Sequence, residues 1–203
     1  GDNTMMGKTH VAIGVLSSLA IFQPTTISQC ALAITGGALG GVAADIDTVD
    51  NDYKHDALIG QLLSFGIVGI MVLILFITNK PELYASLSKD KISICIGIVA
   101  YLILMTKGYL SNHRSFTHSF LAMFLFTIAI GIINLNIIPF YLIGYISHLF
   151  LDLLNKKDVP LLYPLKKGIC FKLCYASKKA NSFFMWLGTF GSIIIILFLL
   201  LFK

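Results

Sequence analysis

The chain has 203 residues, of which 57% are hydrophobic and only 12% are charged, and its formal net charge is +5. A soluble domain carries roughly a quarter charged residues. This composition excludes an ordinary soluble protein and indicates an integral membrane protein. We interpret residues 1–5 as the remnant of an expression tag and the start of the chain, and residues 6–203 as a single integral-membrane domain.

Seven apolar segments follow one another along the chain, and they predict an all-α, polytopic transmembrane helix bundle of six or seven helices. Several segments are shorter than the roughly 20 residues that a helix needs to cross the hydrocarbon core. The first two can therefore form a re-entrant hairpin instead of two full crossings. Glycines in the second segment predict a close approach of neighbouring helix backbones. The segments cover residues 8–22, 27–44, 57–79, 92–107, 116–134, 139–154 and 183–202, and the glycines are Gly36, Gly37, Gly40 and Gly41.

The loop after the sixth segment is rich in lysine and contains one acid, Asp158. Loops with an excess of lysine and arginine stay in the cytoplasm. Counting the crossings back from this loop places the N-terminus and residues 45–56 and 108–114 on the cytoplasmic side, and the loop 80–91 and the C-terminus outside. The lysines are Lys156, Lys157, Lys166, Lys167, Lys172, Lys178 and Lys179.

His148 and Asp152 are four residues apart in the sixth segment, and Asn155 follows three residues later. On a helix this spacing puts an imidazole and a carboxylate on one face, one turn apart. Ionisable residues inside a membrane segment are costly to bury and mark functional sites. We predict that His148 and Asp152 bind a metal ion. The alternative is a hydrogen bond between them that only joins two helices.

The second segment ends in Asp45-Ile46-Asp47. Residues two apart in an extended or turning backbone point the same way, so both carboxylates can converge on one cation. Negative charge at a helix C-terminus is unfavourable. This favours a bound cation over the alternative, a solvated helix end. The acids that follow are expected to be solvated: Asp50, Asp52 and Asp56.

The run His-Arg-Ser-Phe-Thr-His-Ser at 113–119 is the most specific motif. The planar guanidinium of Arg114 matches a phosphate or a carboxylate. Ser115 and Thr117 predict helix caps that leave the first amides of the fifth segment for an anion. His118 is then about one turn into the helix, and His113 precedes it. The alternative is a capped helix with histidines at the membrane edge.

Two further histidines lie outside these motifs. His10 opens the first segment, and a lone histidine near a membrane surface is more often an interfacial residue than a ligand. Its position on the same side as the other clusters favours a ligand. His55 lies in a polar loop, and we predict a surface residue there.

Four elements occur in order along the chain: Gly-Lys-Thr-His10, Ala-Asp45-Ile-Asp47, the run 113–119 and His148-x-x-x-Asp152-x-x-Asn155. Together they resemble the YdjM-like family of membrane-bound metal-dependent hydrolases over residues 6–165. Ala44 stands where this family usually has proline, and Lys156 where it usually has glycine. The resemblance implies an inner-membrane protein of the bacterial cytoplasmic membrane and a metal-dependent hydrolase.

We expect a hydrolase that cleaves a phosphoester of a lipid with an anionic headgroup, using a metal-activated water at the cytoplasmic face. Imidazole and carboxylate ligands suit two or three divalent ions, with zinc favoured and manganese or iron as alternatives. We expect His113 to act as general acid and Arg114 to bind phosphoryl oxygens. The predicted metal ligands are His10, Asp45, Asp47, His118, His148 and Asp152. The predicted substrate-binding residues are Arg114, Ser115, Thr117, Ser119, Asn155, Lys156 and Lys157.

A metal-ion transporter or a metal-sensing membrane protein would use the same ligands. A transporter places its ligands near mid-membrane with a path to both faces, whereas these clusters lie near one face. This difference favours the enzyme. Hydrolysis of an ester or an amide bond in a lipid is a third alternative. The sequence contains no nucleic-acid-binding module and leaves the oligomeric state open.

Overall fold

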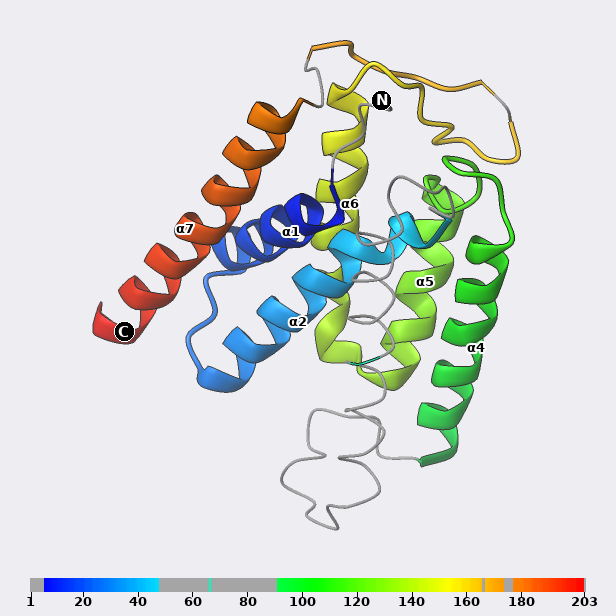
Figure 1. Cartoon of the computed structure of the whole chain (residues 1–203). Coiled ribbons are helices and arrows are strands. Elements are labelled where there is room, and N and C mark those ends of the chain that lie inside the picture. The colour runs from blue at the N-terminus through cyan, green and yellow to red at the C-terminus, as the bar shows by residue number, and fades with distance from the viewer. Residues whose placement is uncertain (1–5, 48–65, 67–90, 166, 174–176, 203) are drawn as a thin grey trace.

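The computed structural model describes residues 6–47, 66, 91–165, 167–173 and 177–202 (Figure 1). These residues form apolar helices, as the sequence predicts. Six of the seven predicted segments match helices, and the segment 57–79 lies, apart from Gly66, outside the described residues. The α-helices are α1 (Gly7–Phe22), α2 (Ile27–Ala43), α4 (Lys91–Tyr109), α5 (Phe120–Ile133), α6 (Ile138–Leu154) and α7 (Lys178–Phe202), and the 3-10 helices are η1 (Ala44–Asp47) and η2 (Leu135–Ile137).

Among the described residues, four helical stretches are long and apolar enough to cross a membrane. The two other α-helices in this part of the chain are shorter: α1 has 16 residues and α5 has 14. At 1.5 Å per residue they are about 24 Å and 21 Å long, less than the roughly 30 Å of the hydrocarbon core. The all-α membrane bundle is thereby confirmed. The four long stretches are Ile27–Asp47, Ile92–Tyr109, Leu135–Leu154 and Lys179–Leu199.

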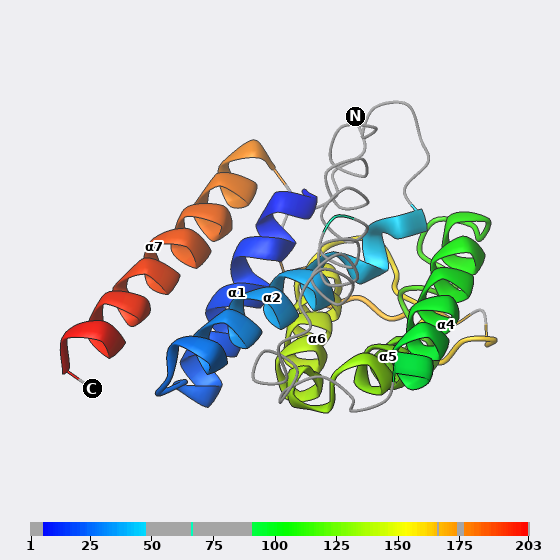
Figure 2. The ribbon, with the colours of Figure 1, turned by 90° about the horizontal axis from the view of Figure 1, so that it is seen from below.

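Helices α1, α2 and α6 pack against one another at the centre, with α7 against α1 on one side and α4 and α5 on the other (Figure 2). Glycine allows this packing, as predicted for the second segment. A Cβ on Gly37 would lie 2.6 Å from the Gly14 carbonyl oxygen, and one on Gly144 would lie 2.5 Å from the Gly37 carbonyl oxygen. Neither position has room for a side chain, so the three backbones are in direct contact.

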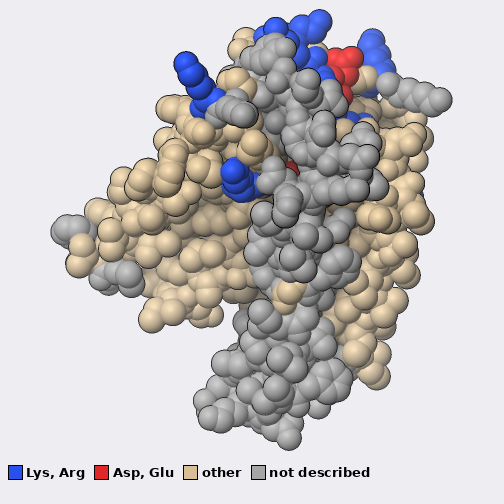
Figure 3. All heavy atoms as spheres, in the orientation of Figure 1, with Lys and Arg blue, Asp and Glu red and all other residues tan. Residues whose placement is uncertain are grey.

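The start of α1, the end of α2 with η1, the loop 110–119 and the end of α6 meet at one end of the bundle (Figure 1). Most of the visible lysine and arginine side chains gather at this end (Figure 3). The loop after α6 is fixed to the bundle, because Phe120 N donates to Leu161 O at 2.9 Å and Phe171 N donates to Leu153 O at 2.7 Å. The crossing count therefore placed the four motifs correctly relative to one another.

Candidate metal centre

His148 and Asp152 lie on the buried face of α6, as their spacing predicts. Their exposed fractions are 0% and 2%, and His148 Nε2 lies 3.6 Å from Asp152 Oδ2. His148 Nδ1 lies 2.8 Å from the Gly41 carbonyl oxygen. A carbonyl only accepts hydrogen bonds, so Nδ1 carries a proton, and Nε2 is the nitrogen that faces the site. This is the usual support of a metal-binding imidazole.

The two aspartates of η1 face different partners, although the sequence suggested that both carboxylates converge. In a 3-10 helix residues two apart are about 240° apart around the axis, so they leave the backbone in different directions. Asp45 Oδ1 lies 3.7 Å from His148 Nε2. Asp47 instead turns to the loop 110–119, away from the imidazole of His148.

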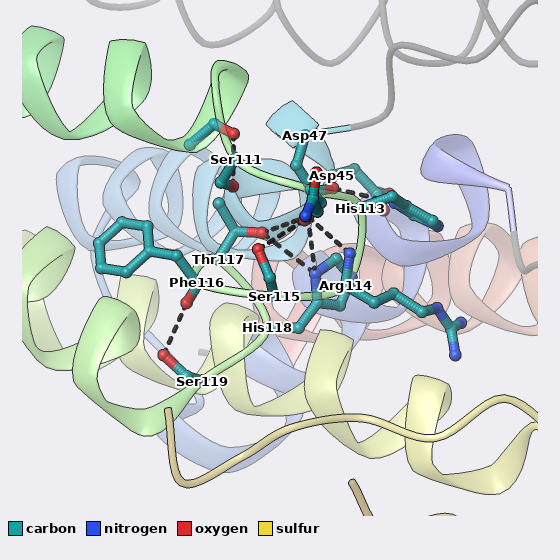
Figure 4. Close-up of polar contacts among 12 residues, drawn as sticks. Asp45, Asp47, Ser111, His113, Arg114, Ser115, Phe116, Thr117, His118 and Ser119 are labelled. Atoms are coloured by element: carbon teal, nitrogen blue, oxygen red, sulfur yellow. Dashed lines mark hydrogen bonds and ion pairs between the residues drawn. The ribbon is translucent and has the colours of Figure 1, made fainter. Parts of the chain in front are cut away.

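From η1, Asp47 forms hydrogen bonds with several residues of the loop 110–119 (Figure 4). Its Oδ1 lies 3.1 Å from His113 Nδ1. Its Oδ2 accepts from Arg114 N at 2.8 Å and from Thr117 Oγ1 at 2.7 Å, and lies 3.4 Å from His118 Nδ1. One buried carboxylate thus fixes the whole loop, and it orients His118 from behind.

The loop 110–119 differs from the prediction in where the helix begins. α5 starts at Phe120, and its N-cap is Ser119, whose Oγ accepts from Ala122 N at 3.2 Å. The predicted caps at Ser115 and Thr117 are wrong. The Thr117 hydroxyl donates a hydrogen bond to Asp47 instead of capping the helix. The predicted anion site on free helix amides is also wrong at Phe120, whose amide donates to Leu161 O.

His118 precedes the helix and points into the cluster. Its Nε2 lies 3.1 Å from Asp152 Oδ2 and 3.5 Å from His148 Nε2. Burial lowers the pKa of His118, but the carboxylates of Asp47 and Asp152 more than offset it and raise this pKa to about 10. Its Nδ1 lies 3.1 Å from Thr117 Oγ1, so Nδ1 is held within the loop and Nε2 faces the site.

The side chain of His10 is buried against that of His148. Its ring stacks on that of His148 with centroids 3.8 Å apart, and its exposed fraction is 1%. Neither ring nitrogen has a hydrogen-bond partner among the described residues. Asp152 Oδ1, at 3.9 Å from Nε2, is too far away for one. A buried polar atom without a partner is costly, so this imidazole fits a position beside a bound cation.

In the described part of the chain, two overlapping groups of nitrogen and oxygen atoms have the spacing of metal ligands. One comprises His10, Asp45 and His148, and the other His118, His148 and Asp152, with ligand atoms within 4.8 Å of one another. Around a tetrahedral ion with bonds of about 2.0–2.1 Å, donor atoms are about 3.3 Å apart. The three separations in the second group are 3.1, 3.5 and 3.6 Å. The residues fit a divalent ion; Asp47 is in neither group.

Arg114 joins the loop to α6. Its Nη2 donates to Asp152 Oδ1 at 2.8 Å and its Nη1 to Lys157 O at 3.0 Å. Nε is buried with no hydrogen-bond partner among the described residues. The backbone of Arg114 is left-handed, with φ 58°, which is unfavourable for a residue with a Cβ. The contacts of its amide with Asp47 and of its guanidinium with Asp152 hold this conformation.

The other predicted substrate-binding residues form the loops around the centre. Ser115 Oγ donates to Asn112 O at 2.6 Å. Asn155 is buried at the end of α6, and its Oδ1 accepts from Lys156 N at 2.8 Å. Lys156 is exposed and Lys157 half-buried. Their contact with a substrate stays a prediction.

Two supporting residues carry no motif that sequence reasoning could use. Asn181, at the start of α7, accepts from Met6 N at 2.8 Å through Oδ1 and contacts Thr9 Oγ1 at 3.2 Å, which ties α7 to the start of α1 beside His10. The Tyr145 hydroxyl donates to the Thr117 carbonyl oxygen within the core. A single asparagine or tyrosine gives no spacing signal. His55 lies outside the described residues.

Fold and site together define a polytopic helical membrane protein with a buried cluster of histidines and aspartates at one end of the bundle. The family model described as YdjM inner membrane protein matches residues 5–202, and the chain belongs to this family. No curated protein and no solved structure matches the chain.

Proposed function

We propose that this protein is a metal-dependent hydrolase that cleaves a phosphoester of a membrane lipid at the cytoplasmic face. One observation carries the proposal: imidazoles and carboxylates from four separate segments converge in a buried cluster, in which the His10 ring has no hydrogen-bond partner among the described residues. Keeping such groups away from water is costly unless a cation balances them. Zinc is the favoured ion, and manganese and iron also suit this ligand set.

Each residue of the cluster has a role in this proposal. A divalent ion lowers the pKa of a water that it binds from 15.7 to about 7. Gly41 O and Asp47 contact Nδ1 of His148 and of His118, so the Nε2 atoms of both rings would be the ones to hold the ion. His113, whose side chain is 32% exposed, stands at the rim with Nδ1 held by Asp47. Its Nε2 is then the atom that gives a proton to the leaving group.

Arg114 supplies the recognition of phosphate. Its guanidinium carries five N–H donors in a planar fork. One contacts Asp152 and one contacts Lys157 O, while Nε has no partner among the described residues. The remaining donors suit a phosphoryl oxygen better than the carbonyl of an uncharged ester, which favours a phosphoester.

The surroundings of the site suit a lipid substrate. The loop after α6 exposes lysines, which favour the cytoplasmic side and attract anionic headgroups at roughly 1 kcal/mol each. The same loop exposes apolar side chains, such as Leu162, Leu165 and Leu173. A lipid can then place its headgroup at the cluster while its acyl chains stay in the bilayer.

A transport function is less well supported. Among the described residues, every aspartate and histidine lies at this end of the bundle. A transporter needs polar groups that continue toward the opposite face. Metal uptake into proteoliposomes distinguishes the two functions, since an enzyme retains its ion and moves none across the bilayer.

The direct test compares wild type with Asp152→Asn and with Asp158→Asn, which removes the charge of an exposed aspartate in the neighbouring loop. Each protein is purified in nanodiscs, its metal content is measured by elemental analysis, and phosphorus NMR follows hydrolysis of a bacterial lipid extract. We expect Asp152→Asn to lose both metal and turnover, and Asp158→Asn to keep both. Full metal content and turnover in Asp152→Asn would refute the proposal.

A further inference from the structure

We infer, on the basis of the proposed metal site, that the centre holds one divalent ion rather than two or three. His118, His148 and Asp152 bind this ion, and the guanidinium of Arg114 takes the place of a second cation on Asp152.

The two candidate ligand groups cannot both be complete, because they share His148. An imidazole can bind an ion through either nitrogen, but Nδ1 of His148 donates to Gly41 O at 2.8 Å. Nε2 alone remains, and one lone pair binds one ion. Without His148, the first group retains only His10 and Asp45, one fewer than the three protein ligands of a catalytic zinc site.

The second group is the better supported of the two. Both of its imidazoles are oriented from behind, His148 by Gly41 O and His118 by Thr117 Oγ1 and Asp47. His10 has no such support among the described residues, since neither of its nitrogens has a hydrogen-bond partner there. Ligands with an outer hydrogen bond have a fixed tautomer and a fixed ring orientation. The ion therefore belongs with His118 and His148, and His10 flanks it.

Asp152 divides its two oxygens between two cations. Oδ2 lies 3.1 Å from His118 Nε2 and 3.6 Å from His148 Nε2, so it faces the ion. Oδ1 accepts from Arg114 Nη2 at 2.8 Å and also faces His10, at 3.9 Å. A second ion between His10 and Oδ1 would meet a buried guanidinium whose side chain is 6% exposed, and repulsion there is weakly screened.

Arg114 cannot easily leave this position. Its Nη1 donates to Lys157 O, and its backbone amide donates to Asp47 Oδ2. Paired metal ions in other hydrolases hold the attacking and the departing oxygens. Here one bound ion and the guanidinium of Arg114 would share that task.

The first experiment is a metal count on the wild-type protein in nanodiscs. The protein is stripped with a chelator, reloaded with Zn²⁺ or Co²⁺, dialysed, and analysed by elemental analysis and calorimetric titration. We expect one ion per chain. Two ions per chain would overturn the inference and leave the proposed function standing, whereas no bound ion would overturn the proposed function itself.

Variants of Arg114 test the role of its charge. Arg114→Gln frees Asp152 Oδ1, so the count should rise above one at high metal concentration. Arg114→Lys keeps the charge and should stay at one, as should the control Lys167→Gln, which removes a positive charge from an exposed position in the loop. A count of one in folded Arg114→Gln would show that Arg114 does not exclude the second ion.

The absorption spectrum of bound Co²⁺ tests the choice of ligands without any activity assay. His118→Ala should abolish the visible bands of the bound ion, whereas His10→Ala should retain them with a weaker affinity. Equal loss of the bands in both variants would overturn the assignment of His10 as a flanking residue.

Discussion

The surroundings of Asp47 and of His10 differ in how their buried polar groups are satisfied. Around Asp47 both carboxylate oxygens have partners, supplied by side chains and a backbone amide of the loop 110–119. Around His10 both ring nitrogens are buried, and the described residues supply no hydrogen bond to either. Both regions contact the buried face of α6: His118 lies against Asp152, and His10 stacks on His148. The chain itself satisfies the polar groups of the first region, whereas the unpaired nitrogens of the second region agree with the proposed binding of a cation.

Removal of the Asp47 carboxylate should have the largest effect. Asp47→Ala leaves Arg114 N, Thr117 and His118 without their buried acceptor, and breaking a buried charged network costs about 3–5 kcal/mol. We expect a large fall in the thermal unfolding temperature of the metal-free protein in detergent. The control Asp45→Ala should cost less, because that side chain is 14% exposed. Equal effects would show that the Asp47 network does not stabilise the fold.

The pH dependence of stability tests the contribution of His118 to the Asp47 region. Its pKa is about 10 in the folded protein against 6.5 for the ordinary side chain. A raised folded pKa stabilises the fold fully below pH 6.5, and this stabilisation is lost as the pH rises toward 10. The metal-free protein should therefore melt at a lower temperature at pH 9.5 than at pH 7. His118→Gln should reduce this pH dependence of the melting temperature. If the dependence is unchanged in His118→Gln, His118 is not the group that causes it.

Gly41→Ala should disturb the His10 region more than the Asp47 region. A Cβ at this position would lie 2.6 Å from the His10 carbonyl oxygen, so α1 has to move away from α2. Overpacking of this kind costs about 1–3 kcal/mol. The Gly41 carbonyl also orients His148, and loss of such support lowers metal affinity about 10–100-fold. Calorimetric titration with Zn²⁺ measures this loss, and an unchanged affinity would show that metal binding does not depend on the close packing of α1 against Gly41.

The same contrast explains what the sequence could predict. Hydropathy predicted the apolar helices, because a chain in lipid must satisfy its backbone hydrogen bonds within apolar helices; these are α1, α2, α4, α5, α6 and α7. The number of crossings predicted that the motifs lie at one end of the bundle. The separate directions of Asp45 and Asp47 could not be predicted, because they depend on a 3-10 turn of four residues. The start of α5 was misplaced because Phe116 is apolar, like the helix after it. Phe116 is buried outside any helix, with its ring 5.7 Å from that of Tyr163.

His10→Phe should have the smallest effect on stability, and in the opposite direction. The ring of phenylalanine replaces an imidazole of similar shape, and it removes two buried nitrogens that have no hydrogen-bond partner in the described part of the chain. Replacement of an unsatisfied polar group by an apolar one is neutral or stabilising, here by about 1 kcal/mol. The metal-free variant should melt at the same temperature as wild type or slightly higher.

With Zn²⁺ bound, His10→Phe should lose its advantage over wild type. If His10 flanks a cation, the increase in melting temperature that Zn²⁺ produces should be smaller in His10→Phe than in wild type, because stabilisation by a ligand follows its affinity. A fall in the melting temperature of the metal-free variant would mean that the protein itself satisfies His10. The regions around Asp47 and His10 would then both be satisfied by the protein, through different partners. The buried imidazole of His10 would no longer indicate a bound cation.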